Sequence, residues 1–159
     1  MLLVGMSDAH DPRQVPMLSI DAELQLAGGT SARVTLFLST RSPRHDGPET
    51  LGEFLDAPRR FLPVRTERGN GLVARDAIVT VRVAKDVEAG RPDAPPPAID
   101  MVRIALENGA AIDGVLLHPA AGNRARLSDF FNTAPDFFAV EDEGGIVHVS
   151  KRRVVSITF

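Results

Sequence analysis

Residue types able to perform acid–base, nucleophilic or metal chemistry are few and scattered in this sequence. The chain has four histidines and no cysteine, which excludes a thiolate nucleophile, a disulfide and a cysteine-bound metal. His45 stands beside Asp46 in a loop rich in glycine and proline, and His148 alternates with valines, which places it on the wet face of a strand. The sequence contains no histidine pair with metal-ligand spacing, no Gly-x-Ser-x-Gly motif and no phosphate-binding glycine loop. We therefore predict no catalytic residue, no metal and no cofactor.

Two basic turns offer the most specific binding chemistry. Lys151, Arg152 and Arg153 form one run, and Arg75 stands beside Asp76 in a corresponding stretch. Such turns could contact RNA phosphates, but solvated charges that keep a sheet edge from unwanted pairing explain them as well. We favour the second interpretation, because the chain has no Trp or Tyr to stack on bases and its eight Phe suit a hydrophobic core. RNA binding through Arg75, Lys151, Arg152 and Arg153 is the alternative.

Composition and charge narrow the class of protein. The chain is 43% hydrophobic and 25% charged, which is typical of a soluble globular protein. Its net charge of −3 argues against a surface that grips nucleic acid all over. No run of 18 apolar residues occurs, and residues 1–6 lack the basic start of a signal peptide. We expect a cytoplasmic location and no membrane partner.

One sequence pattern occurs twice in the chain. Residues 51–83 align without a gap with residues 127–159, which lie 76 positions later, and eight of the 33 positions are identical. Upstream the offset is 80, because the loop between Leu38 and Leu51 is four residues longer in the first copy. We interpret the pattern as an internal duplication.

Each copy has the pattern of five short strands and one helix. Alternating apolar residues around Gly28-Gly29 and around Asn108-Gly109 predict an opening hairpin. A leucine followed by aromatic or apolar residues three and four positions later predicts a short helix that ends before a proline. The expected strands are 18–26, 32–38, 61–64, 72–74 and 78–83, then 101–106, 112–117, 137–140, 146–150 and 154–159, with helices at 51–56 and 126–132.

The domain organisation follows from these elements. Three consecutive prolines within residues 84–100 favour a semi-rigid spacer rather than part of a core. We predict a flexible lead-in over residues 1–17, a first module over 18–83, a proline-rich linker over 84–100 and a second module over 101–159.

The strand pattern resembles the Sm-like superfamily. Residues 106–116, Leu-Glu-Asn-Gly-Ala-Ala-Ile-Asp-Gly-Val-Leu, look like the first Sm motif, and residues 73–81 and 149–157 look like the second motif in its bacterial host-factor (Hfq) form. The resemblance covers about half the chain and implies an all-β fold: two tandem Sm-like (SH3-like) five-stranded small barrels, each with one short inserted helix. Glycine at 114 permits a sharp bend and a close backbone approach. The first copy has Val34 there, so we expect it to curve differently or close less.

The resemblance also bears on function. It places Arg75-Asp76 and Lys151-Arg152 where the bacterial family has a Lys-His pair that contacts RNA, although Asp76 would repel phosphate. The aspartate and asparagine of the uridine pocket of classical Sm proteins have no counterpart here. Family members pair the fourth strand of one unit with the fifth strand of its neighbour. By this resemblance a tandem chain could form the pairing internally, and could extend it into a ring or a larger assembly by leaving one edge open. We therefore predict a non-catalytic protein-interaction or scaffold module that binds a protein partner or self-associates through open sheet edges.

Overall fold

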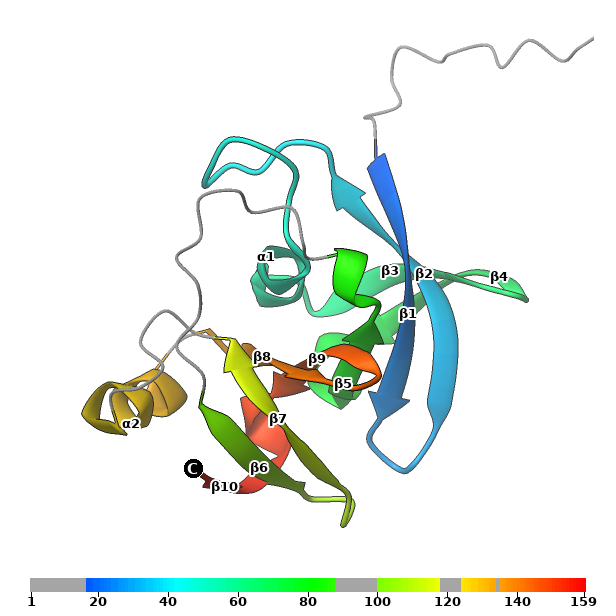
Figure 1. The fold of residues 1–159 in the computed structure, drawn as a ribbon. Coiled ribbons are helices and arrows are strands. Elements are labelled where there is room, and N and C mark those ends of the chain that lie inside the picture. Colours follow the sequence, from blue (N-terminus) through cyan, green and yellow to red (C-terminus); the bar gives the residue numbers. More distant parts are fainter. Residues whose placement is uncertain (1–16, 88–99, 118–123, 134) are drawn as a thin grey trace, which may run out of the picture.

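The structure is a computed structural model of the chain and describes residues 17–87, 100–117, 124–133 and 135–159. Most of the predicted lead-in (1–17) and linker (84–100) lies outside these residues. The described chain is all-β, with ten antiparallel strands in one sheet and two short helices (Figure 1).

The strands and helices occur where the sequence pattern predicts them. Their ends differ from the expected ones by three residues or fewer. The N-terminal half contains β1 (Met17–Leu26), β2 (Ser31–Ser39), α1 (Leu51–Asp56), β3 (Phe61–Thr66), β4 (Gly69–Ala74) and β5 (Ile78–Val83). The C-terminal half contains β6 (Met101–Leu106), β7 (Ala111–Leu117), α2 (Arg124–Asn132), β8 (Phe137–Asp142), β9 (Gly145–Ser150) and β10 (Val154–Thr158). Short 3-10 turns η1 (Arg75–Ala77) and η3 (Lys151–Arg153) precede β5 and β10, and η2 (Lys85–Val87) follows β5.

The strand order differs from two closed barrels. The sheet runs β10-β6-β7-β8-β9-β5-β1-β2-β3-β4, so each half has the same internal order and the halves meet where β5 pairs with β9. This junction joins the fifth strand of one half to the fourth strand of the other. The sheet is continuous and does not close, because β4 and β10 each have only one neighbouring strand within the described residues. The predicted pair of separate closed barrels is therefore replaced by one open sheet.

Buried apolar residues form two clusters, one in each half, and each cluster includes residues from the other half. The cluster of the N-terminal half includes Phe137 and Ile146 from β8 and β9. The cluster of the C-terminal half includes Val79 from β5. Because side chains cross the junction in both directions, burial of apolar surface fixes the two halves against each other.

Gly114 lies where β7 passes close to the backbone of β8. A Cβ atom at this position would lie 2.5 Å from the Glu141 carbonyl oxygen, so only glycine allows β7 to approach β8 this closely. Three residues of β7 pair with β8. In the N-terminal half, where Val34 replaces the glycine, β2 and β3 pair only between Thr35 and Arg65. The ladder between β2 and β3 is therefore shorter than the one between β7 and β8.

Substituting Gly114 tests this close approach. We expect Gly114→Ala to lower the free energy of unfolding by roughly 1–3 kcal/mol, the usual range for overpacking, as measured by denaturant titration. Gly71→Ala is the matched control, because a Cβ atom there would lie 3.8 Å from Val64, at ordinary contact distance. Equal stability of the two variants would show that β7 and β8 do not depend on the missing side chain.

Candidate functional site

The junction between β5 and β9 combines a strand pairing between the two halves with an ion pair beside it. The two strands pair antiparallel from Thr80 opposite Val149 to Val83 opposite Ile146. At one end of the pairing the Arg82 guanidinium donates two hydrogen bonds, of 2.6 and 2.8 Å, to the Asp142 carboxylate. These hydrogen bonds hold the pKa of Asp142 below its ordinary value, against the opposing effect of burial. A bidentate ion pair therefore joins the two halves beside the strand pairing.

Two glycines let the β8–β9 turn come this close to β5. A Cβ atom on Gly145 would lie 2.2 Å from the Val83 carbonyl oxygen, and one on Gly144 would lie 2.7 Å from Nη1 of Arg82. Gly145 also has φ of +134°, a conformation that other residues rarely adopt. The turn can therefore carry no side chain at either position without moving the strand or the arginine.

A cavity of about 550 Å³ opens beside this junction, and residues of β1, β2, β3 and β5 line it. Its charged lining is balanced in sign: Arg33, Arg65 and Arg82 against Asp21, Glu23 and Glu67. Gly144 lines it from the C-terminal half. Arg82 and Gly144, which face each other across the junction, therefore both line the cavity.

The open edge at β4 exposes apolar side chains. Leu72 is 68% exposed and Phe61, on the neighbouring β3, is also exposed. The residues 76 positions later, which we call their equivalents, are His148 and Phe137. Both lie at the junction and both are buried, His148 with 4% of its surface exposed.

The open edge at β10 shows the same contrast. Val155 is 70% exposed, whereas its equivalent Val79 in β5 is 1% exposed and packs in the core of the other half. Phe159, just beyond β10, is exposed, whereas its equivalent Val83 is buried. Both edges therefore present the apolar positions that the internal junction covers.

His148 lies elsewhere than the alternation of valines predicts. It was expected on a wet face, but every residue of β9 is buried, because β9 lies between β8 and β5 and packs with both halves. The prediction was wrong because period-2 alternation assumes one solvated face. The junction removes that face.

The first predicted RNA contact, Arg75, points back into the fold. Its guanidinium donates to the Leu55 and Ala57 carbonyl oxygens at 3.2 and 3.0 Å, at the C-terminal end of α1. It also contacts the Asp136 carboxylate at 2.9 Å, which lies in the other half. Arg75 therefore caps a helix whose last carbonyl groups lack partners within the helix.

Lys151 performs the equivalent task in the C-terminal half. Its ammonium group donates to the carbonyl oxygens of Phe130 and Thr133, at the end of α2, and lies 4.0 Å from the Phe130 ring centroid. Burial lowers the pKa of Lys151, although the carboxylates of Asp136 and Asp56 act in the opposite direction. A basic residue at the start of each 3-10 turn thus stabilises the helix of its own half.

The remaining two basic residues cross to the other half of the chain. Arg153 forms an ion pair of 2.7 Å with Glu107 and donates to the Asp76 backbone carbonyl. Arg152 lies 3.7 Å from the Asp76 carboxylate, and both of these side chains are largely exposed. The structure therefore brings the two basic turns together around Asp76, with carboxylates beside three of the four basic residues.

Neighbouring residues in η3 distinguish helix capping from surface charge. We expect Lys151→Met to lower the free energy of unfolding by about 1–2 kcal/mol, because two carbonyl groups lose a charged donor. Arg152→Met should change it by less than about 0.5 kcal/mol, as is usual for an exposed side chain. Denaturant titration of both variants measures the difference, and an equal effect of the two substitutions would contradict the capping role.

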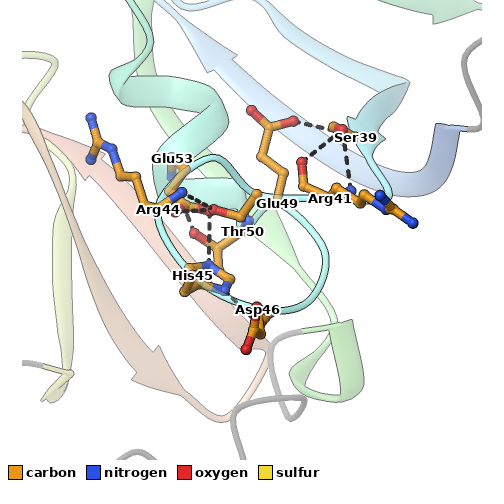
Figure 2. Close-up of polar contacts among 9 residues, drawn as sticks. Ser39, Arg41, Arg44, His45, Asp46, Glu49, Thr50 and Glu53 are labelled. Carbon is orange, nitrogen blue, oxygen red and sulfur yellow. Dashed lines mark hydrogen bonds and ion pairs between the residues drawn. The ribbon is translucent and has the colours of Figure 1, made fainter.

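The loop between β2 and α1 contains a cluster of polar contacts, which Figure 2 shows. The Glu53 carboxylate accepts from the Thr50 backbone N–H at 2.8 Å and from the Ser42 hydroxyl at 2.8 Å, and it contacts His45 Nε2 at 3.2 Å. The Thr50 hydroxyl accepts from the Glu53 N–H in return, which completes a capping box. The Ser42 hydroxyl and the His45 imidazole both contact the Glu53 carboxylate, and these contacts hold it at the N-terminus of α1.

Acid should weaken this loop through Glu53. Burial by itself raises the pKa of Glu53, but the hydrogen bonds from Thr50, Ser42 and His45 together bring it below the ordinary value. A folded pKa below the unfolded one adds stability above about pH 4.3, and this contribution is lost as the pH falls through the folded pKa. We expect Glu53→Gln to be less stable than wild type at pH 7 and this difference to shrink between pH 5 and pH 3. A difference that stays constant over that range would contradict the role of the charge.

Other classes of site find little support in the described residues. Within these parts of the chain no group of three or more His, Cys, Asp or Glu is arranged to hold a metal ion. Neither α1 nor α2 is long and apolar enough to cross a membrane. Comparison with protein-family models finds no match, and comparisons with curated proteins and with solved structures find none either.

Proposed function

We propose that the protein is a non-catalytic scaffold made of two Sm-like units, which assembles head to tail with copies of itself. In this assembly β10 of one copy adds to β4 of the next, as β5 adds to β9 inside the chain. The support is that the internal junction supplies a complete example of the contact, and that the equivalent two edges lie at the ends of the sheet, without a second neighbouring strand among the described residues.

The internal register predicts the register between copies. Each pair of the β5–β9 ladder has equivalents 76 positions away on β10 and β4. The predicted partners are Ser156 with Val73, Ile157 with Leu72, Thr158 with Gly71, and Phe159 with Asn70.

Burial at equivalent positions is the observation that carries the proposal. Leu72 and Val155 are about two-thirds exposed, but their equivalents at the junction are almost fully buried. Covering one large apolar side chain contributes about 1.5–3 kcal/mol, whereas association costs about 4–15 kcal/mol in lost freedom. A few such side chains plus a strand pairing therefore predict an assembly that depends on protein concentration.

The two surfaces are different, which sets the type of assembly. A contact between unlike edges is heterologous, so it leaves one β4 and one β10 edge free after each addition. Such a series ends when it closes into a ring, or continues as a filament if the rotation between copies does not close.

RNA binding by the basic turns is the second possibility from the sequence. The turns lie together, but Arg75 and Lys151 are used as helix caps and Arg153 is paired with Glu107. The net charge of −3 also opposes phosphate binding. The observations therefore favour self-association, and RNA becomes an outcome of the test.

Charged substitutions on the two edges test the proposal. Sedimentation velocity over a range of concentrations should show wild-type mass rising above that of one chain, and Leu72→Asp or Val155→Asp should abolish the rise, because a carboxylate cannot be buried unpaired. Met101→Asp is the matched control: Met101 is 62% exposed on β6, which is not an edge strand, and its counterpart in the N-terminal half is Asp21.

Two results would reject the scaffold. Wild-type protein could remain a single chain at every concentration. Alternatively, the larger species could contain RNA and collapse on ribonuclease treatment, in which case the RNA-binding alternative would replace it. The first result removes self-association and the second changes the partner.

A further inference from the structure

We infer that the Arg82–Asp142 ion pair, together with Gly144, is a latch that strengthens the junction inside the chain, and that its absence at the outer edges keeps the contact between copies weaker and reversible. This inference rests on the proposed head-to-tail assembly. It concerns what makes the internal and external contacts differ.

At the outer edges of the sheet, the residues equivalent to Arg82 and Asp142 carry no charge. Thr158 on β10 stands where β5 has Arg82, and Thr66 on β3 stands where β8 has Asp142. Two hydroxyl groups cannot replace a guanidinium and a carboxylate that form two hydrogen bonds across the junction. The external contact therefore lacks the charged part of the internal one.

The turn next to the latch also differs in side-chain size between the internal and external contacts. Gly144 leaves room for the long Arg82 side chain, since a Cβ atom there would lie 2.7 Å from its Nη1. The equivalent of Gly144 is Arg68, which would meet the short Thr158 in the external contact. Inside the chain, the long Arg82 side chain on β5 faces a glycine in the turn. In the external contact, the short Thr158 side chain on β10 would face the long Arg68 side chain in the turn. An arginine at position 158 would fit only if position 68 lost its side chain.

The charged residues next to Arg82 and next to Thr158 also differ between the internal and external contacts. Inside the chain, Arg82 lies opposite Glu23 on β1 and interacts with its charge, in addition to Asp142. On the outer side, Thr158 lies opposite Arg103, whose guanidinium is already paired with Asp113 at 2.7 Å. Because Arg103 is already paired within its own chain, it does not supply to the external contact the charge that Glu23 supplies inside the chain, and that contact depends mainly on backbone hydrogen bonds and apolar side chains. It should therefore respond only slightly to salt.

The consequence is a sheet with two strengths of junction. Halves joined by one chain and by the latch stay together, whereas copies associate and separate as the concentration of protein changes. Restoring the three latch residues at the outer edges should convert the second type of junction into the first.

Transplantation of the latch is a gain-of-function test. A Thr66→Asp/Arg68→Gly/Thr158→Arg variant should self-associate with a dissociation constant about tenfold or more below that of wild type, as measured by sedimentation velocity. The gain should diminish at high salt, because the added contact is ionic. Thr158→Arg alone is the control, since it adds the guanidinium without the carboxylate and leaves Arg68 in place. It should associate no more tightly than wild type.

The two proposals fail in different ways. If wild type assembles, Leu72→Asp abolishes assembly and the triple variant is no tighter than wild type, the latch is overturned but the scaffold stands. If neither wild type nor the triple variant assembles, the scaffold fails and the latch with it. A triple variant that assembles more tightly than both wild type and the Thr158→Arg control supports both.

Discussion

The pairing of β5 with β9 is the interaction on which the rest of the structure depends. Strand β5 contributes to two cores at once: Val81 packs in the cluster of the N-terminal half and Val79 in that of the C-terminal half. Phe137 and Ile146 cross the boundary in return. A module of about 65 residues buries too little surface to be more than marginally stable alone. The shared strand pair lets each half complete its core with side chains of the other.

Joining the halves through one strand pairing leaves β4 and β10 as the edges of the sheet in the described part of the chain. Proteins commonly protect such edges with charges, prolines or bulges, because an open edge invites further pairing. Here β4 carries an exposed leucine. The β10 edge has one of these devices, a bulge in its pairing with β6, but the residue at the bulge is an exposed valine. The positions that would be charged in a protected edge are thus apolar, and their equivalents are buried at the internal junction. This makes the edges the part of the surface best suited to a partner.

The basic residues of the two 3-10 turns stabilise the fold, although the sequence alone also allows them a role in binding. A 3-10 turn before the last strand of each half brings its first residue, Arg75 or Lys151, to the end of the helix in the same half. The helix needs donors for its last carbonyl groups, and a long cationic side chain can reach them. The same geometry places Arg152 and Arg153 beside Asp76 of the other half. Each of these four basic residues thus contacts a carbonyl or carboxylate group within the chain.

The local order of strands, turns and helices could be predicted from the sequence, because alternation, glycine turns and prolines act between near neighbours in the chain. The close approach at Gly114 was predictable for the same reason: the residue type limits the local backbone. The family resemblance allowed a fourth-to-fifth strand pairing inside the chain, but only the tertiary structure decided that this pairing joins the halves into one open sheet, that His148 is buried and that the Arg82–Asp142 ion pair joins the halves. These features depend on contacts between residues about 60 or more positions apart, and pairing at that distance leaves no periodic signal in either strand.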